Sequence, residues 1–195
     1  MPHVAREDCV LVVIDAQPGF YGSHRVDVDR ARHESALSTA AWVTGLARAL
    51  SVPVVVTEED AATNGPTSAA ITGALPEGTS VMDKAVFGAN DNPPIDSAVR
   101  AHGRSTVVLV GTETDVCVAH SAMGWQASGL RVLVVHDAVY SAGKAHENGL
   151  MRLRQEGVEL LSAKELYYEW LRTLANVRDF DAENPDLASP PGFSL

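Results

Sequence analysis

A continuous run of β-branched and leucine residues, TVVLV at residues 106–110, constrains most strongly what this chain can fold into. The run does not alternate between polar and apolar residues, which is typical of a strand in a parallel sheet that is covered on both faces. Gly111 ends the run, and a short polar turn then leads into an apolar helix with Cys117 in its first turn. We therefore expect a parallel sheet, with Cys117 near the carboxyl end of one strand.

Cys117 has two interpretations when this stretch is considered alone. Thr114 and Asp115 are of the types that cap helices, and the dipole at a helix N-terminus favours the thiolate form of a cysteine. The unpaired N–H groups of such a turn can also hold a developing oxyanion. Most cysteines, however, are small core residues. Cys117 is thus either a nucleophile or a packing residue.

The composition limits the class of protein. A chain of 195 residues with 46% hydrophobic residues is long enough for one well-packed domain, so we expect a single domain over residues 1–195. The net charge of −10 argues against nucleic acid or an anionic membrane surface as a partner. No apolar stretch has the length of a signal peptide or a membrane span, and Cys9 and Cys117 suggest no disulfide framework. A cytoplasmic protein is expected.

A second apolar run, at residues 9–14, ends in Asp15 and predicts a first parallel strand. Open parallel sheets bind ligands at the carboxyl ends of their strands, which makes Asp15 a candidate site residue. The Pro and Gly residues that follow predict a loop, from which Gln17 and Phe20 are free to face a site. Phe20 is equally well interpreted as a cover over the core.

The next strand is predicted at residues 52–57, and three carboxylates follow it at residues 58–60. They could bind a metal ion, but no histidine lies nearby, so a solvated loop is the favoured interpretation and no metal site is expected. Residues 61–78 are rich in Gly, Pro, Ser and Thr and predict a long loop that includes one helical turn, of a length that often forms a lid. A short strand at residues 80–82 precedes Lys84, which by default is an ordinary surface lysine.

The remaining pattern continues to alternate between strands and helices. Helices are predicted at residues 29–50, 94–102 and 144–156, strands at 131–141 and 158–161, and a last helix with an apolar face from Leu166 to Leu174. Residues 176–195 are polar and rich in proline, and we expect a C-terminal tail that is loose or ordered on a neighbouring subunit. The pattern predicts an α/β fold, and no glycine-rich fingerprint for a dinucleotide follows the first strand.

Three motifs occur in order, each after a predicted strand: VIDAQPGF around Asp15, DKAVFGAN around Lys84 and GTETDVCVAHSA around Cys117. Together they resemble the isochorismatase-like cysteine hydrolase family, and the likeness extends over residues 8–175. The resemblance implies a three-layer α/β/α sandwich, a Rossmann-like arrangement, with a six-stranded and mostly parallel sheet. It also implies a catalytic triad of Asp15, Lys84 and Cys117.

The resemblance further implies a cis peptide bond between Thr112 and Glu113, with the backbone N–H groups of Glu113 and Cys117 as an oxyanion hole. Further contacts to a small-molecule substrate are expected from side chains around these motifs, namely Gln17, Phe20, Phe87 and Glu58.

Two departures from the family narrow the expected reaction. Nicotinamidases of the family carry an Asp, His, His metal set after the second strand, whereas this chain has TEEDAATNG at residues 57–65, so neither a metal nor another cofactor is expected. True isochorismatases cleave a vinyl ether and commonly lack the cysteine. The chain is therefore more similar to the metal-free hydrolases of the family.

The expected function is hydrolysis of a small amide or a related C–N bond through a thioester on Cys117, with Asp15 accepting the thiol proton and Lys84 supporting the charged pair. Ether, ester or ureido hydrolysis at the same site is one alternative, and a catalytically silent binding or scaffold protein is another. The helix after Cys117 is apolar around most of its circumference and includes Met123 and Trp125, so a homo-oligomer is expected.

Overall fold

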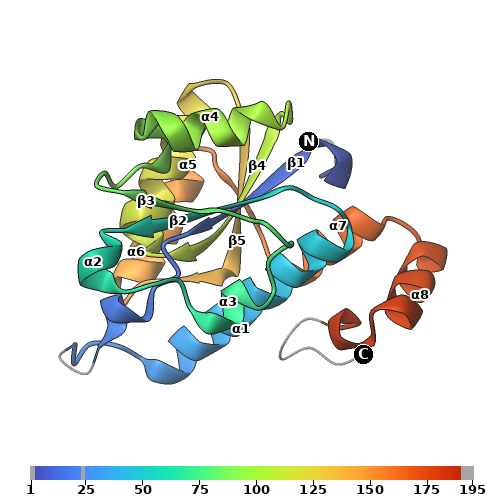
Figure 1. Cartoon of the computed structure of the whole chain (residues 1–195), viewed down its shortest axis with the longest axis horizontal. Helices are drawn as coiled ribbons and strands as arrows, with labels where there is room; N and C mark the ends of the chain where they lie inside the picture. Colours follow the sequence, from blue (N-terminus) through green and yellow to red (C-terminus); the bar gives the residue numbers. More distant parts are fainter. Residues whose placement is uncertain (1–2, 23–24, 190–195) are drawn as a thin grey trace.

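The computed structural model describes residues 3–22 and 25–189 and shows a three-layer α/β/α sandwich built on one six-stranded sheet (Figure 1). All neighbouring strands are parallel, in the order β3-β2-β1-β4-β5-β6. The strands are β1 (Cys9–Ile14), β2 (Val54–Glu59), β3 (Val81–Lys84), β4 (Thr106–Thr112), β5 (Arg131–Tyr140) and β6 (Glu159–Leu161). The expected fold class is confirmed, and the sheet is parallel throughout.

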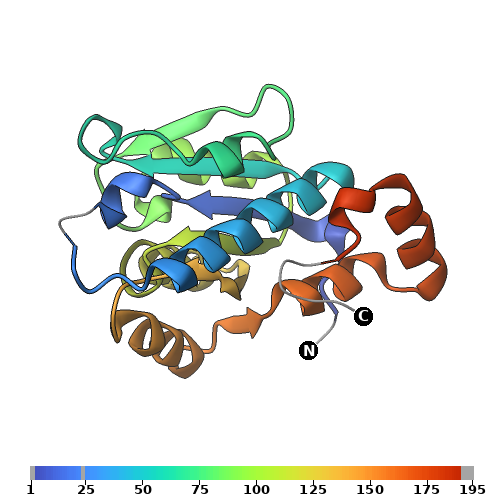
Figure 2. The same cartoon turned by 90° about the horizontal axis from the view of Figure 1, so that it is seen from below.

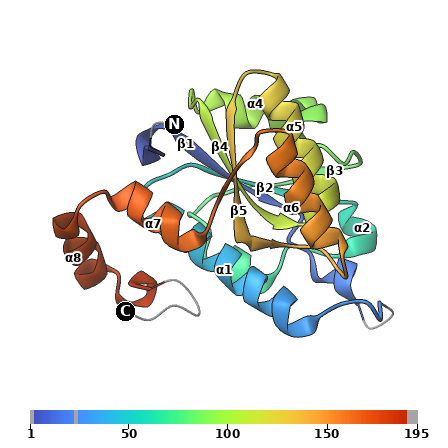
Figure 3. The ribbon, with the colours of Figure 1, turned by 180° about the vertical axis from the view of Figure 1, so that it is seen from behind.

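Helices cover both faces of the sheet (Figures 1 and 3). One face carries α1 (Arg30–Ala49) and α7 (Ala163–Leu171), and the other carries α4 (Pro93–Ala101), α5 (Ala119–Ala127) and α6 (Ala145–Gln155). Helix α8 (Leu174–Glu183) lies beyond the end of α1 (Figure 2). Among the residues that the structure describes, no helix is both long enough and apolar enough to cross a lipid bilayer.

Strand β1 shows why its sequence does not alternate between polar and apolar residues. Successive side chains of a strand point to opposite faces of the sheet, and both faces are covered here. Alternate residues of β1 belong to two different core clusters: Cys9, Leu11 and Val13 pack on the side of α1 and α7, and Val10 and Val12 pack on the side of α4, α5 and α6. The whole strand is buried.

The helix starts follow local capping signals in several places. Asp29 caps α1, because its side chain accepts a hydrogen bond from the Arg32 N–H at 3.1 Å. Helix α7 begins with a capping box, in which the side chains of Ser162 and Glu165 each accept from the other residue's backbone N–H. The helix predicted at residues 29–50 therefore begins where its capping residue indicates.

The segment 61–78, expected as a long loop with one helical turn, contains two short helices, α2 (Ala61–Asn64) and α3 (Ala69–Thr72). Ile71 of α3 is fully buried in the core on the α1 side of the sheet. The Ser68 N–H donates to the Ala16 carbonyl at 2.8 Å. This part of the segment is therefore fixed to the chain directly after β1.

The last predicted helix is divided in two, and the segment after it is ordered on its own chain. Arg172 has a φ of 70°, which ends α7, and Leu174 then begins α8. Leu174 was expected on an apolar face but is 65% exposed. Phe180 and Leu187 pack on the core that α1 and α7 cover. This part of the expected tail is therefore helical and packs on its own chain, and residues 190–195 lie outside the described residues.

Trp125, expected at an interface between subunits, is fully buried within its own chain. Its indole N–H donates to Asp96 Oδ1 of α4 at 2.8 Å. Helix α5 is apolar around most of its circumference because it is covered on several sides, by the sheet, by α6 and by Asp96 of α4. Trp125 therefore offers no contact to a second subunit.

Two helix glycines allow a matched test of the packing that supports the Cys117 turn. A Cβ at Gly149 of α6 would lie 2.8 Å from the backbone N and Cα of Asp115, whereas a Cβ at Gly45 of α1 would meet only the flexible end of Leu187, at 3.1 Å. We expect Gly149→Ala to lower the free energy of unfolding by about 1–3 kcal/mol through overpacking. Gly45→Ala should change it by less than about 1 kcal/mol, because the helix propensity of alanine offsets a small shift of Leu187.

Urea denaturation of both variants measures this difference. A Gly149→Ala variant as stable as the wild type would contradict the close packing of α6 on the turn that carries Cys117.

Candidate active site

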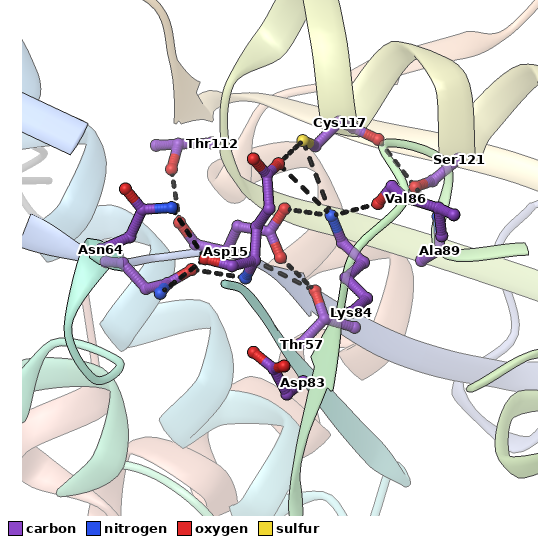
Figure 4. Close-up of polar contacts among 12 residues, drawn as sticks. Asp15, Thr57, Asn64, Asp83, Lys84, Val86, Ala89, Thr112, Cys117 and Ser121 are labelled. Atoms are coloured by element: carbon purple, nitrogen blue, oxygen red, sulfur yellow. Dashed lines mark hydrogen bonds and ion pairs between the residues drawn. The ribbon is translucent and has the colours of Figure 1, made fainter. Parts of the chain in front are cut away.

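Four side chains meet at the carboxyl edge of the sheet, and Figure 4 labels three of them, Asp15, Lys84 and Cys117. Asp15 follows β1, Glu59 ends β2, Lys84 ends β3, and Cys117 lies in the π-helical turn η4 (Thr114–Val118) after β4. Parallel strands all end at the same edge, so these residues come together although they are far apart in the sequence. The β2–β3 register places Glu59 directly beside Lys84.

The Lys84 ammonium lies at the centre of this cluster. Its Nζ is 2.7 Å from Asp15 Oδ2, and it donates to the Val86 carbonyl at 2.9 Å. It is also 3.7 Å from both Cys117 Sγ and Glu59 Oε2. The side chains of Lys84 and Asp15 have no exposed surface, so this lysine is not the surface residue that its type suggests by default. The structure thus brings Asp15, Lys84 and Cys117 together.

Asp15 is held by contacts at both carboxylate oxygens and at its backbone. Oδ1 accepts a hydrogen bond from the Thr57 hydroxyl at 2.7 Å, and Oδ2 pairs with Lys84. The Asp15 N–H donates to the Thr57 carbonyl at 3.1 Å, and its carbonyl accepts from the Thr112 hydroxyl at 2.6 Å. Burial raises the pKa of Asp15, against the opposing effects of Lys84 and Thr57. Asp15 has little freedom to move in this arrangement.

The Cys117 thiol is a hydrogen-bond donor in the structure. Sγ donates to Glu59 Oε2 at 3.0 Å, and the residue is 3% exposed. Burial, followed by the charge of Asp15, raises the pKa of Cys117 well above its ordinary value, although Lys84 acts in the opposite direction. These two effects favour the protonated thiol and oppose the helix dipole, which favours the thiolate.

The residues expected to cap the Cys117 helix have other partners. Thr114 Oγ1 lies 3.0 Å from His146 Nδ1, and Asp115 Oδ1 accepts a hydrogen bond from Ser141 Oγ at 2.6 Å. Neither side chain caps the turn η4, and α5 begins only at Ala119. The capping prediction is wrong because tertiary contacts take up both side chains.

Glu59 is the site residue that the sequence interpretation missed. Its backbone is held on two sides, since the Glu59 N–H donates to Gln17 Oε1 at 2.7 Å and its carbonyl accepts from Gln17 Nε2 at 3.2 Å and Asn64 Nδ2 at 2.8 Å. The Glu59 side chain is 20% exposed, unlike those of Asp15 and Lys84. One feature of the sequence could have identified Glu59. It is the last residue of β2, and β2 pairs with β3, the strand that ends in Lys84.

The other predicted contact residues lie around the cluster in different environments. The Gln17 amide is used by Glu59 and by the Gly65 carbonyl, which it reaches at 2.6 Å. Glu58 Oε1 accepts from the Thr67 N–H at 2.5 Å and from its hydroxyl at 2.7 Å. Phe20 is partly buried beside Tyr21, and Phe87 is 55% exposed with its ring edge-on to His120. In this structure, Gln17 and Glu58 hold the chain around the site.

The turn before the cysteine has its own ion pair. The peptide bond between Thr112 and Glu113 is cis. The Glu113 carboxylate accepts from Arg25 Nη1 at 2.8 Å, and the Arg25 guanidinium lies 5.6 Å from the centre of the Tyr21 ring. An arginine from the segment after β1 is thus paired with the residue that was expected to supply one oxyanion-hole N–H.

Three groups of the cluster are of the types that bind metal ions. Ligand atoms of Asp15, Glu59 and Cys117 all lie within 4.8 Å of one another. The Lys84 Nζ, however, is within 3.7 Å of each of these three side chains. The ammonium is therefore the cation of this cluster, and its charge opposes the binding of a second one.

Comparison with known proteins identifies the family. The protein-family model described as Isochorismatase domain matches residues 9–165 of this chain. The mouse Isochorismatase domain-containing protein 2A is 31% identical over 170 residues, which cover 85% of this chain and 76% of the mouse protein. The Probable hydrolase YcaC of Escherichia coli (strain K12) is 25% identical over 171 residues, covering 85% of this chain and 80% of YcaC.

Two solved structures share the fold. The MAR1 ribonuclease from Caenorhabditis elegans has a TM-score of 0.84 at 24% identity, over 100% of this chain and 98% of that one. The YcaC gene product from Escherichia coli is described as an octameric hydrolase of unknown specificity. It has a TM-score of 0.81 at 22% identity, over 96% of this chain and 93% of YcaC. The family match and the mouse relative show that this chain belongs to the isochorismatase family of hydrolases.

Proposed function

We propose that this chain hydrolyses a small amide or a related C–N bond through a thioester on Cys117. The observation that carries the proposal is the position of the Lys84 ammonium, 3.7 Å from Cys117 Sγ and 2.7 Å from Asp15 Oδ2, in a cluster nearly closed to solvent. A cation at this position stabilises a thiolate when the thiol loses its proton. Asp15, Lys84 and Cys117 form the proposed catalytic triad.

In the proposed reaction, the sulfur attacks the substrate carbonyl as its proton passes to a carboxylate of the cluster. The backbone N–H groups of Glu113 and Cys117 hold the oxygen that becomes negative. The amine leaves, and water then releases the acid from the thioester. Because the thiol is a hydrogen-bond donor in the structure, the reaction needs a base, and two carboxylates, Asp15 and Glu59, lie close enough to serve.

The four residues expected to contact the substrate, Gln17, Phe20, Phe87 and Glu58, have two kinds of role in the proposal. Phe87 follows Val86, whose carbonyl binds Lys84, so its exposed ring offers an apolar surface beside the cluster. Phe20 offers a second, partly buried ring. Gln17 and Glu58 order the chain around the cluster through the backbone groups that they hold.

Other reactions fit these residues less well. Ether or ester hydrolysis at the same site is the alternative within the family. A catalytically silent binding protein would not need a buried ion pair in contact with a thiol. MAR1 is named a ribonuclease, but at 24% identity it shows the fold alone. The net charge of −10 and a site with two carboxylates also disfavour a polyanionic substrate.

A screen of small carboxamides for ammonia release tests the proposal. With an amide found in this way, we expect Cys117→Ala and Cys117→Ser to abolish turnover and keep the fold, since each removes the strong nucleophile. Cys9→Ala is the control, because Cys9 is fully buried in β1 and burial raises its pKa to about 12. Ammonia release that persists in Cys117→Ala would show that the reaction does not need the thiol.

We propose that the site works without a metal ion, because Lys84 already supplies the cation among the possible ligands. Metal analysis of the purified protein is expected to find no stoichiometric zinc or iron, and EDTA should leave turnover unchanged. Loss of activity with EDTA that one added metal restores would refute this expectation.

We also propose a homo-oligomer in the cytoplasm. The octameric assembly is described for YcaC, and a self-associating surface is favoured here by exposed apolar side chains on and after the edge strand β3, namely Val81, Val86 and Phe87. Cys9 and Cys117 are both free, which fits a reducing compartment.

Sedimentation equilibrium at micromolar concentration tests the assembly, with a mass well above the 20.7 kDa of one chain as the expected result. Phe87→Glu should lower this mass, because a charge would then have to be buried in the interface. Met151→Glu is the matched control, since Met151 is similarly exposed on α6. A fully active species at the mass of one chain would contradict the proposal.

A further inference from the structure

We propose that Glu59 is the catalytic acid and base of this site, the residue that exchanges protons with Cys117, with the leaving nitrogen and with the attacking water. The inference rests on the proposed thioester reaction and assigns the proton transfers within it. It replaces Asp15 in the role that the family resemblance implies, and makes Asp15 the positioning residue for Lys84.

The first support is the direction of the thiol proton. Cys117 Sγ donates to Glu59 Oε2 at 3.0 Å, a length suited to a hydrogen bond that involves sulfur. A general base must lie within hydrogen-bond reach of the proton that it removes. Glu59 meets this condition before any substrate has bound.

The second support is that Asp15 is already occupied. Its Oδ1 accepts from Thr57, its Oδ2 pairs with Lys84 at 2.7 Å, and its side chain has no exposed surface. Protonation of Asp15 would leave the buried Lys84 charge without its closest partner, which costs several kcal/mol. Protonation of Glu59 leaves the Asp15–Lys84 pair intact, because Glu59 Oε2 is 3.7 Å from the ammonium.

The third support is access. The amine leaves and water enters from the side open to solvent, so the group that serves both must face that side. The Glu59 side chain is 20% exposed, and Oε2 is the only one of its two carboxylate oxygens with a partner among the described residues. Oε1 is thus available to a substrate N–H or to water.

Glu59 is also held in place as a catalytic group requires. Gln17 binds its backbone N–H and its carbonyl, and Asn64 binds the same carbonyl at 2.8 Å. The pairing of β2 with β3 fixes it beside Lys84. A group whose backbone is fixed by surrounding side chains loses little entropy when the reaction begins.

The proton transfers balance over one cycle. The Sγ–H proton moves to Glu59 as the S–C bond forms and the carbonyl π pair moves to oxygen. The intermediate collapses, the C–N bond breaks and Glu59 gives its proton to the leaving nitrogen. Water then attacks the thioester and gives a proton to Glu59, the C–S bond breaks, and Glu59 returns the proton to sulfur. The net change is amide plus water to acid plus amine.

The activated ester p-nitrophenyl acetate tests this assignment, because its leaving group needs no proton. At mildly alkaline pH, where hydroxide can take the thiol proton as the sulfur attacks, we expect Glu59→Gln to form the acetyl adduct on Cys117 but to hydrolyse it about 100-fold or more slowly than the wild type, the scale of general acid–base catalysis. Nitrophenolate release then stops near one equivalent, and mass spectrometry finds the adduct.

Asp83→Asn is the matched control. It removes one carboxylate charge from the neighbouring strand β3 and keeps an oxygen for the Ala61 N–H that Asp83 binds. This variant should turn over like the wild type. Sustained turnover by Glu59→Gln at the wild-type rate would overturn the assignment to Glu59, and sustained turnover by Cys117→Ala would instead overturn the thioester reaction itself.

Rescue by a small acid separates catalysis from a structural role. In Glu59→Ala, added formate should restore hydrolysis of the acetyl adduct in proportion to its concentration, because the opening left by the partly exposed side chain admits it. A Glu59→Ala variant that keeps its thermal stability, forms the adduct and gains nothing from formate would contradict a direct proton-transfer role.

Discussion

The buried ion pair between Lys84 and Asp15 is the interaction on which the rest of the candidate active site depends. Two charges without solvent contact carry a desolvation cost of several kcal/mol each, which only close pairing and further hydrogen bonds offset. Thr57 binds Asp15 and the Val86 carbonyl binds Lys84, so the sheet edge supplies those bonds. With the ammonium fixed, the thiol of Cys117 and the carboxylate of Glu59 each lie 3.7 Å from it.

The sequence predicted the parts of the structure that local patterns encode. Continuous apolar runs predict strands covered on both faces, and Asp29 caps its helix as its type suggests. The motifs around Asp15, Lys84 and Cys117 identified the residues that the sheet edge brings together. Which of the carboxylates at 58–60 enters the site could not be read locally, because it depends on where β2 ends and on the register that pairs Glu59 with Lys84.

The wrong predictions share a physical cause, because each treated a local signal as if tertiary contacts were absent. Thr114 and Asp115 are good capping residues, but His146 and Ser141 take up their side chains. The helix dipole favours a thiolate, whereas burial and the charge of Asp15 act in the opposite direction on the Cys117 pKa. Trp125 has the character of an interface residue, but Asp96 binds its indole within the same chain.

Strand β3 lies at the edge of the sheet and, within the described part of the chain, pairs with β2 alone, through residues Val81–Lys84. Elements with few partners open more readily than central ones. Lys84 is anchored on this strand, whereas Asp15 and Cys117 follow the central strands β1 and β4. Fraying of one short edge would therefore withdraw the cation and leave two carboxylates beside a neutral thiol, while the core stayed folded. If β3 opens first, activity at this site would be lost through a local event, and its lifetime would follow the stability of this strand rather than that of the whole molecule.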